Sequence, residues 1–369
     1  MNTGIIYREE LKEYDFGPGH PFRGDRYRIF PQFLAQHLKQ EGNYDFITAE
    51  AANDTDLSLI CDMDYVKFTA DYFHAAHLGK NTDEENFYLY HTGDNHPAGR
   101  PGNLEHAARI IIGQARKAAD LVTAGQYQKA VSIGGGMHHA KRNNGEGFCV
   151  YNDVAFAGKY LVENCRLDRV LILDTDAHAG NGTSEYFYGD PRVLFIDIHQ
   201  DPRTIYPGTG YTFEIGEGDG KGKTVNIPMP TYAGDDAYRL VFDEIVLPVA
   251  REFQPQIIVR NGGSDPHFSD QLTQLGLTLK GFHTVGQKVA ELAELCEGKE
   301  IDLIASGYNR EILPYAWFSL LAGLMKWDVT LGEPVTGQEI PAADQSLAAT
   351  RHVITEVKSH LKPYWHSLR

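Results

Sequence analysis

The sequence has few cysteines, and their spacing excludes two classes of protein. Of its 369 residues only four are cysteine, and Cys61, Cys149, Cys165 and Cys296 form no CxxC pair. Disulfide-stabilised secreted domains and thiolate zinc sites both need more numerous or more closely spaced cysteines. We therefore predict free thiols in a reducing compartment.

The sequence also lacks long hydrophobic runs. No stretch approaches the ~18 uninterrupted apolar residues of a transmembrane helix. The N-terminal segment MNTGIIYREELKEYDFG has no basic region followed by an apolar block, as a secretory signal would have. These absences predict no membrane partner and a cytoplasmic location.

The chain has fewer basic than acidic residues. Lysine and arginine number 34 against 50 aspartates and glutamates, which gives a net charge of −16 at pH 7. Binding to a phosphate backbone needs a basic surface, so we predict no nucleic-acid partner. The negative charge would attract a cationic substrate, but it also serves solubility alone, and both explanations stay open.

Short apolar runs alternate with helical stretches along the chain. Strand-like runs occur at 130–133, 170–173, 193–198, 256–259 and 301–305, and helices are expected at 104–125, 151–164, 234–252, 281–297, 314–326 and 344–362. This alternation is typical of βαβ units and predicts the α/β class, with a mostly parallel central sheet flanked by helices. We find no linker, so we predict one domain over residues 1–369. Glycine-rich stretches at 80–103 and 206–223 are expected to be long surface loops.

The most informative segment is DTDAH at 174–178, which directly follows an apolar run. Side chains alternate between the faces of a strand, so Asp174, Asp176 and His178 are predicted to point the same way. They would converge at the carboxyl end of a strand, where α/β proteins usually carry their sites. Two carboxylates and an imidazole suit a divalent metal such as zinc.

Polar residues also follow three other strand-like runs. His138 and His139 follow one, Asp265 another and Tyr308 a third. Each has a plain structural explanation when taken alone: paired histidines are usually surface residues, an aspartate before a proline can begin a turn, and tyrosines usually pack in the core. The carboxyl ends of parallel strands lie along one edge, however, so their shared position favours one common pocket.

The chemistry of this set is that of metal-assisted amide hydrolysis. Asp176, His178 and Asp265 would supply three protein ligands and leave a fourth metal position open for a water. The histidine pair could act as general base and acid, because imidazole titrates near neutral pH. Asp174 could orient one of these histidines, and the Tyr308 hydroxyl could stabilise an oxyanion.

Six motifs occur in order along the chain. They are GGGMHHA at 134–140, GFCVYND at 147–153, DTDAHAGNGT at 174–183, YPGTG at 206–210, NGGSD at 261–265 and SGYN at 306–309. With these motifs the chain resembles, over nearly its whole length, the zinc-dependent histone deacetylase family, which includes acetoin-utilisation proteins and acetylpolyamine amidohydrolases. The resemblance implies an arginase/deacetylase-type fold, one Zn2+ per chain, and hydrolysis of an N-acetylated amine such as acetyl-lysine to acetate and a free amine.

The resemblance also implies residue roles. It places the metal ligands at Asp176, His178 and Asp265, the catalytic groups at His138, His139, Asp174, Asn181 and Tyr308, and the substrate-binding residues at Asp94, Gly147, Phe148, Tyr206 and Arg26. Gly147 and Phe148 would form one wall of an acyl-lysine tunnel and Tyr206 the other. Arg26 would lie near the inner acetate cavity. The family also binds potassium through backbone carbonyls around 174–178, which makes K+ a second candidate ion.

Some positions depart from the family pattern. Asn181 stands where many members have an aspartate that pairs with the second histidine, and an amide cannot stabilise an imidazolium as a carboxylate does. His139, the expected base, should therefore titrate at lower pH than in aspartate-bearing members. Tyr206 replaces a commoner phenylalanine and would make the rim more polar. Lysine deacetylases of the family bind the backbone of a peptide substrate through an aspartate at the rim of the site, and Asp94 is the best candidate for that residue.

Several alternatives remain at this point. The substrate could be an acetylpolyamine, which a narrow pocket closed by a second copy of the chain would favour, so a homo-oligomer is an open prediction. A binuclear manganese ureohydrolase would need further metal-binding carboxylates where Ala179 and Asn181 stand. A non-catalytic module that binds acylated ligands is disfavoured by the intact set of ligands and catalytic groups. The metal ligands would accept iron as well as zinc.

Overall fold

A computed structural model describes residues 3–38, 44–335 and 337–369 of the chain. Within this part, eight strands are assigned to one sheet in the order β2-β1-β3-β8-β7-β4-β5-β6, and helices flank it. The strands are β1 (Thr3–Ile6), β2 (Tyr44–Ile47), β3 (Lys129–Ile133), β4 (Val170–Asp174), β5 (Val193–Gln200), β6 (Thr224–Met229), β7 (Ile257–Gly262) and β8 (Glu300–Ile304). The predicted α/β class is confirmed.

The chain divides into two compact units. Unit 1 comprises Met1–Cys165 with Asp302–Ala305, and unit 2 comprises Arg166–Ile301 with Ser306–Arg369. The single domain expected over residues 1–369 stays a prediction. No helix in the described ranges is long and apolar enough to cross a membrane.

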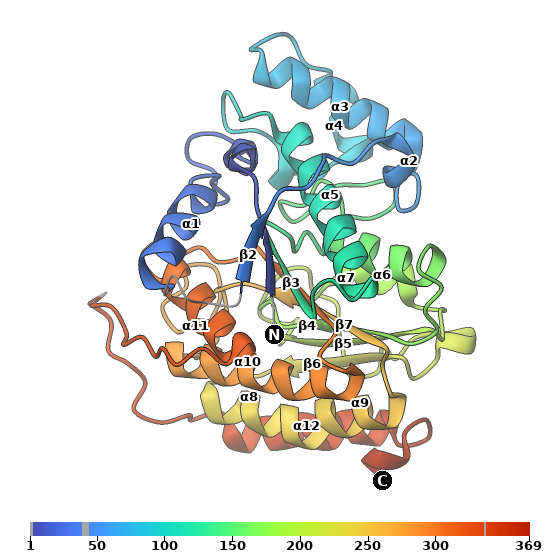
Figure 1. Cartoon of the computed structure of the whole chain (residues 1–369), viewed down its shortest axis with the longest axis vertical. Coiled ribbons are helices and arrows are strands. Elements are labelled where there is room, and N and C mark those ends of the chain that lie inside the picture. Colours follow the sequence, from blue (N-terminus) through green and yellow to red (C-terminus); the bar gives the residue numbers. More distant parts are fainter. Residues whose placement is uncertain (1–2, 39–43, 336) are drawn as a thin grey trace. The chain divides into compact units, whose positions relative to one another are not determined.

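In unit 1, β1 pairs in parallel with β2 on one side and β3 on the other. Its helical elements are η1 (Glu9–Glu13), α1 (Arg26–His37), α2 (Asp54–Leu57), α3 (Met63–His77), α4 (Glu84–Tyr90), η2 (Gly93–Asn95), α5 (Leu104–Thr123) and α6 (Asp153–Glu163). The long helix α5 lies beside α6 and β3 (Figure 1). It buries an apolar stripe that includes Ile110, Ile111 and Leu121, and this burial is what anchors it to the strands.

In unit 2, β4 pairs in parallel with β5 and β7, and β5 pairs with β6. Its helical elements are α7 (Asn181–Phe187), η3 (Gly218–Gly220), α8 (Asp235–Val241), the π-helical turn η4 (Phe242–Val246), α9 (Leu247–Phe253), α10 (Leu279–Ala293), η5 (Glu294–Cys296), α11 (Leu313–Met325), α12 (Leu347–Leu361) and η6 (His366–Leu368). Helix α8 lies between α10 and α12 (Figure 1). Every residue of β4, β5 and β7 is buried, which explains why each of these strands begins with a continuous apolar run.

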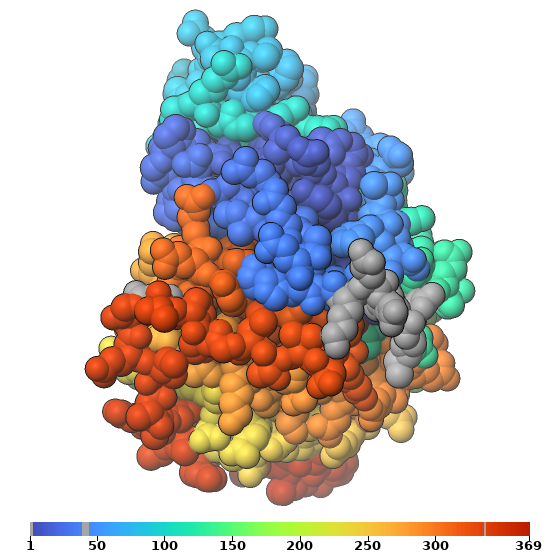
Figure 2. Space-filling view, turned by 60° about the vertical axis from the view of Figure 1, so that its left-hand side comes forward, coloured from blue at the N-terminus to red at the C-terminus, as the bar shows by residue number. Residues whose placement is uncertain are grey.

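The expected helices correspond to α5, α6, α8 to α9, α10, α11 and α12, with ends shifted by a few residues. Residues 206–223 contain no strand or α-helix, as expected of a loop. The prediction of a loop over residues 80–103 is partly wrong, because this stretch contains α4. Asp83 begins this helix by accepting the Asn86 N–H, and Phe87 is buried beneath it. Between α11 and α12, the described residues are mostly exposed and appear in orange-red on the surface of unit 2 (Figure 2).

Two glycines let α10 and α11 approach each other closely. A Cβ on Gly323 would lie 2.0 Å from the His283 carbonyl oxygen, and one on Gly286 would lie 2.1 Å from the Leu320 carbonyl oxygen. Backbone atoms cannot move aside as a flexible side chain can, so the helices would have to separate.

We expect Gly323→Ala to lower the free energy of unfolding by about 1–3 kcal/mol, as overpacking does, despite the better helix propensity of alanine. Gly332→Ala is the matched control, because nothing lies within 4 Å of its added Cβ. Urea unfolding of both variants measures the difference. Equal stability of the two would show that the close contact does not constrain the helices.

Candidate metal site and histidine pair

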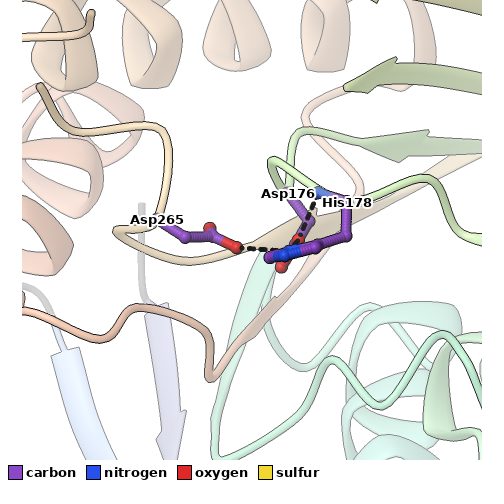
Figure 3. Close-up of side chains that lie close together, drawn as sticks. All are labelled: Asp176, His178 and Asp265. Carbon is purple, nitrogen blue, oxygen red and sulfur yellow. Dashed lines mark hydrogen bonds and ion pairs between the residues drawn. The ribbon is translucent and has the colours of Figure 1, made fainter. Parts of the chain in front are cut away.

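Three buried side chains of unit 2 form a compact group of potential metal ligands. Ligand atoms of Asp176, His178 and Asp265 all lie within 4.8 Å of one another. The three side chains point toward one another (Figure 3). His178 Nδ1 lies 3.1 Å from Asp176 Oδ1 and 3.2 Å from Asp265 Oδ2. The first two residues follow β4 and the third follows β7, which pairs with β4. Pairing of the two strands is therefore what brings the ligands together.

The conformation of the DTDAH segment differs from the prediction. Strand β4 ends at Asp174, and the residues after it form bends, so alternation along a strand is not what orients these side chains. Instead, Asp174 Oδ1 accepts the Asp176 N–H at 3.0 Å, and Asp176 Oδ1 accepts the His178 N–H at 2.8 Å. Aspartates stabilise turns by accepting the N–H two residues on. Asp174 Oδ2 also accepts from the Asn261 amide at 2.9 Å.

A serine fixes the orientation of the Asp265 carboxylate. Ser306 Oγ donates to Asp265 Oδ1 at 2.7 Å, which leaves Oδ2 facing His178. Ser306 also accepts the Ser264 N–H through its carbonyl oxygen, so the segment after β8 is tied to the one after β7. Partners of this kind hold a ligand in one orientation and tune its basicity. The sequence placed Ser306 in the SGYN motif without indicating this role.

The charges of the three side chains fit a divalent ion. Burial, followed by the charge of Asp176, raises the pKa of Asp265 to about 8 against the opposing effect of His178. Burial lowers the pKa of His178, but hydrogen bonds to the two carboxylates outweigh it and raise that pKa to about 10. The two carboxylates thus hold a proton on the imidazole, where a metal cation would replace it. Two carboxylates and one imidazole suit zinc and leave a coordination position for water.

Tyr308 lies near this group on a constrained turn. Its ring centroid is 6.3 Å from that of His178, at 87°. Gly307 before it has φ +123°, and a Cβ there would lie 1.8 Å from Ser264 Oγ, so the turn requires glycine. Asp270 Oδ2 accepts the Tyr308 N–H at 2.8 Å. Asp270 was not singled out in the sequence, although it follows the NGGSD motif closely.

The tandem histidines lie in unit 1, beside the segment expected to form a substrate wall. Nε2 of His138 and Nε2 of His139 are 3.1 Å apart, and both rings are buried. Gly147 lies against the second ring, where a Cβ would approach His139 Cδ2 to 2.3 Å. Asp94 Oδ2 accepts the Gly147 N–H at 2.7 Å. These four predicted residues are therefore neighbours.

The motif GFCVYND also holds the histidine pair, a role that the sequence did not reveal. Asp153 accepts the N–H groups of Gly136 (2.9 Å) and Met137 (2.7 Å) through its buried carboxylate. The Asn152 amide donates to the carbonyl oxygens of His138 and Ala140 at 3.0 Å each. Together these two side chains hydrogen-bond to the backbone before and after the histidine pair.

The remaining predicted residues have these positions. Arg26 begins α1, donates to the Ala305 carbonyl oxygen at 2.8 Å and stacks over Phe22. The ring of Phe148 lies 4.7 Å from that of His20. Tyr206 is 43% exposed in the loop after β5. Asn181 is the first residue of α7.

Metal binding should stabilise the protein through the Asp176–His178–Asp265 group. Zn2+ at a hundredfold excess over its Kd should raise the free energy of unfolding by about 2.7 kcal/mol. Thermal unfolding with and without Zn2+ measures this shift. In Asp265→Asn the shift should shrink, because one charged ligand is lost, whereas the exposed control Asp219→Asn should keep it. An unchanged shift in Asp265→Asn would place the ion elsewhere.

Asp153 should make stability depend on pH. Burial raises its pKa to about 6, against the opposing effect of its backbone hydrogen bonds. The folded state therefore keeps this proton to higher pH than the unfolded chain. The contribution is complete below the unfolded pKa of ~4 and is lost as pH rises through about 6.

Relative to Asp153→Asn, the wild type should accordingly lose about 2 kcal/mol of unfolding free energy between pH ~4 and ~7. Urea unfolding at several pH values measures the difference, with Asp71→Asn on the exposed side of α3 as control. A wild type that gains stability relative to Asp153→Asn over this range would reverse the sign and refute the argument.

Comparison with known proteins agrees with these motifs. The family model of the histone deacetylase domain matches residues 20–324. The chain is 34% identical to a probable deacetylase of Archaeoglobus fulgidus, over 99% of each chain. It is also 34% identical to the acetoin utilization protein AcuC of Staphylococcus aureus, over 89% of this chain and 83% of the relative.

A solved structure shows the same fold. The crystal structure of the HDA15 HD domain matches with a TM-score of 0.83 at 24% identity, covering 100% of this chain and 97% of that one. The likeness to it concerns the fold alone. The family model and the relatives, which match along most of the sequence, show that this chain belongs to the histone deacetylase family.

Proposed function

We propose that the chain is a zinc-dependent deacetylase that removes acetyl groups from N-acetylated amines, with acetyl-lysine in proteins as the first candidate substrate. The observation that carries the proposal is the buried Asp176–His178–Asp265 group with Tyr308 beside it. A donor set of this composition supports hydrolytic zinc, and a phenol supports stabilisation of an oxyanion. The proposal treats the whole chain as one catalytic domain.

The proposed ion would be held by Asp176, His178 and Asp265. When bound, it would lower the pKa of a water molecule and polarise the amide carbonyl. The Tyr308 hydroxyl would donate a hydrogen bond to the oxygen on which negative charge develops. Fixing the Tyr308 backbone through Asp270 supports this role, because a donor that is already in place needs no reorganisation during the reaction.

We propose the histidine pair as the proton-transfer groups. His139 would take the proton of the attacking water, and a histidine of the pair would return a proton to the leaving amine. Their Nε2 atoms are 3.1 Å apart, so one proton can be shared between the two rings. Support by Asn152 and Asp153 would hold this pair in place. K+ near 174–178 remains a proposal that rests on the resemblance alone.

One observation favours a small acetylated amine, such as an acetylpolyamine, as the second candidate substrate. The carboxylate of Asp94 already accepts the Gly147 N–H and the Thr92 hydroxyl. It therefore has fewer lone pairs for the backbone of a peptide. A small cationic amine needs no such anchor and would still be attracted by the negative charge of the chain.

Amine release from an acetyl-lysine peptide and from an acetylpolyamine tests both candidates with zinc-loaded protein. Tyr308→Phe should lower kcat/KM by about 10²–10³ on the preferred substrate, as loss of one oxyanion donor does. Tyr232→Phe is the matched control, because this tyrosine is 66% exposed.

The ratio of the two rates would choose between the substrates. Full activity in Tyr308→Phe would refute the role of this hydroxyl. Zinc bound without turnover of either compound would overturn the proposed activity and favour a module that binds acylated ligands.

A further inference from the structure

His199 near the carboxyl end of β5 is fully buried, yet both of its ring nitrogens face oxygen acceptors. Nδ1 lies 2.9 Å from Asp197 Oδ1, and Nε2 lies 2.9 Å from the Gly210 carbonyl oxygen. A carbonyl oxygen cannot donate, and an ionised carboxylate accepts only. Nε2 therefore donates to Gly210, while Nδ1 lies within ion-pair distance of the Asp197 carboxylate without a hydrogen bond to it.

The same carboxylate contacts the segment that carries the metal ligands. Asp197 Oδ2 accepts the Gly180 N–H at 2.8 Å, two residues beyond His178. One end of the Asp197–His199 pair thus holds the turn after β4. The other end holds Gly210, which belongs to the YPGTG motif in the loop after β5.

Gly210 is fixed from several directions. Its φ is +96°, and a Cβ would lie 2.5 Å from His199 Nε2 and 2.9 Å from the Ala179 Cβ. Glu214 Oε2 accepts the N–H groups of Gly210 (2.6 Å) and Tyr211 (3.1 Å). The residue is therefore the anchor of its loop, whereas Tyr206, four residues earlier, is largely exposed.

We propose that Asp197 and His199 are positioning residues that set the Tyr206-bearing loop relative to the turn of the metal ligands, and so set the affinity for the substrate. The proposal rests on the proposed function and on the role that the family resemblance implies for Tyr206, a wall of the acyl-lysine tunnel. Burying an ion pair is a weak source of stability compared with apolar packing. Asp197 and His199 hydrogen-bond to one loop each, and apolar side chains at these two positions could not make those bonds.

Two substitutions of His199 separate positioning from folding. His199→Gln places an amide donor where Nε2 was and can keep the bond to Gly210. His199→Asn places its amide where Nδ1 was and loses that bond. Both remove the imidazole that faces Asp197, so both should lower the melting temperature.

We expect His199→Asn to raise KM at least about fivefold with a smaller change in kcat. A displaced Tyr206 loop would weaken binding of the substrate and of the transition state equally, and such a loss raises KM but not kcat. His199→Gln should restore most of the KM. Val249→Ala in the core of α9 serves as a stability control, since it should lower the melting temperature without raising KM. Equal KM values in the two His199 variants would overturn the proposal.

Hydrogen exchange provides a readout that does not require activity. The amides of Gly210 and Tyr211 should exchange faster in His199→Asn than in His199→Gln, because the loop loses its anchor only in the former. Equal exchange in the two variants would also overturn the proposal. A wild type without turnover would count against the proposed function, while this exchange comparison would still decide the role of His199.

Discussion

The candidate site depends on keeping two carboxylates and an imidazole together inside the protein. Burying an unpaired carboxylate costs several kcal/mol, and two adjacent carboxylates also repel each other. His178 Nδ1 faces both Asp176 and Asp265, and Ser306 satisfies the second oxygen of Asp265. The fold must therefore bring a positive charge and a fixed donor to the ends of β4 and β7. A divalent metal would meet the same requirement more completely.

The glycine-rich segments around the proposed catalytic groups are held by carboxylates that accept backbone N–H groups. Asp174 holds the turn of the candidate metal ligands, Asp270 holds the backbone of Tyr308, and Asp153 in unit 1 holds the segment before the histidine pair. Glycines offer no side chain for packing, so such segments need another means of fixation. Charge-assisted bonds from one carboxylate to several N–H groups supply it.

The accuracy of the sequence predictions follows the range of the interactions concerned. The amphipathic pattern of α5 and the apolar runs of β4 and β5 are local, and these elements were predicted to within a few residues. β1 and β2, which are only four residues long, were missed, and so was β6. The same-face argument for 174–178 was wrong because side-chain bonds to the backbone end the strand at Asp174. Ser306 and Asp265 are 41 residues apart, so no local pattern reveals their bond.

By itself the sequence determined the α/β class and the family, and it predicted the residues of the candidate site. These follow from residue identity and from periodicity along the chain, both of which are local properties. Only the tertiary structure decided which oxygen of Asp265 faces His178, which backbone groups Asp153 and Asp270 hold, and that His199 is buried between two acceptors. Those choices depend on strands and loops that burial of apolar surface brings together from distant parts of the sequence.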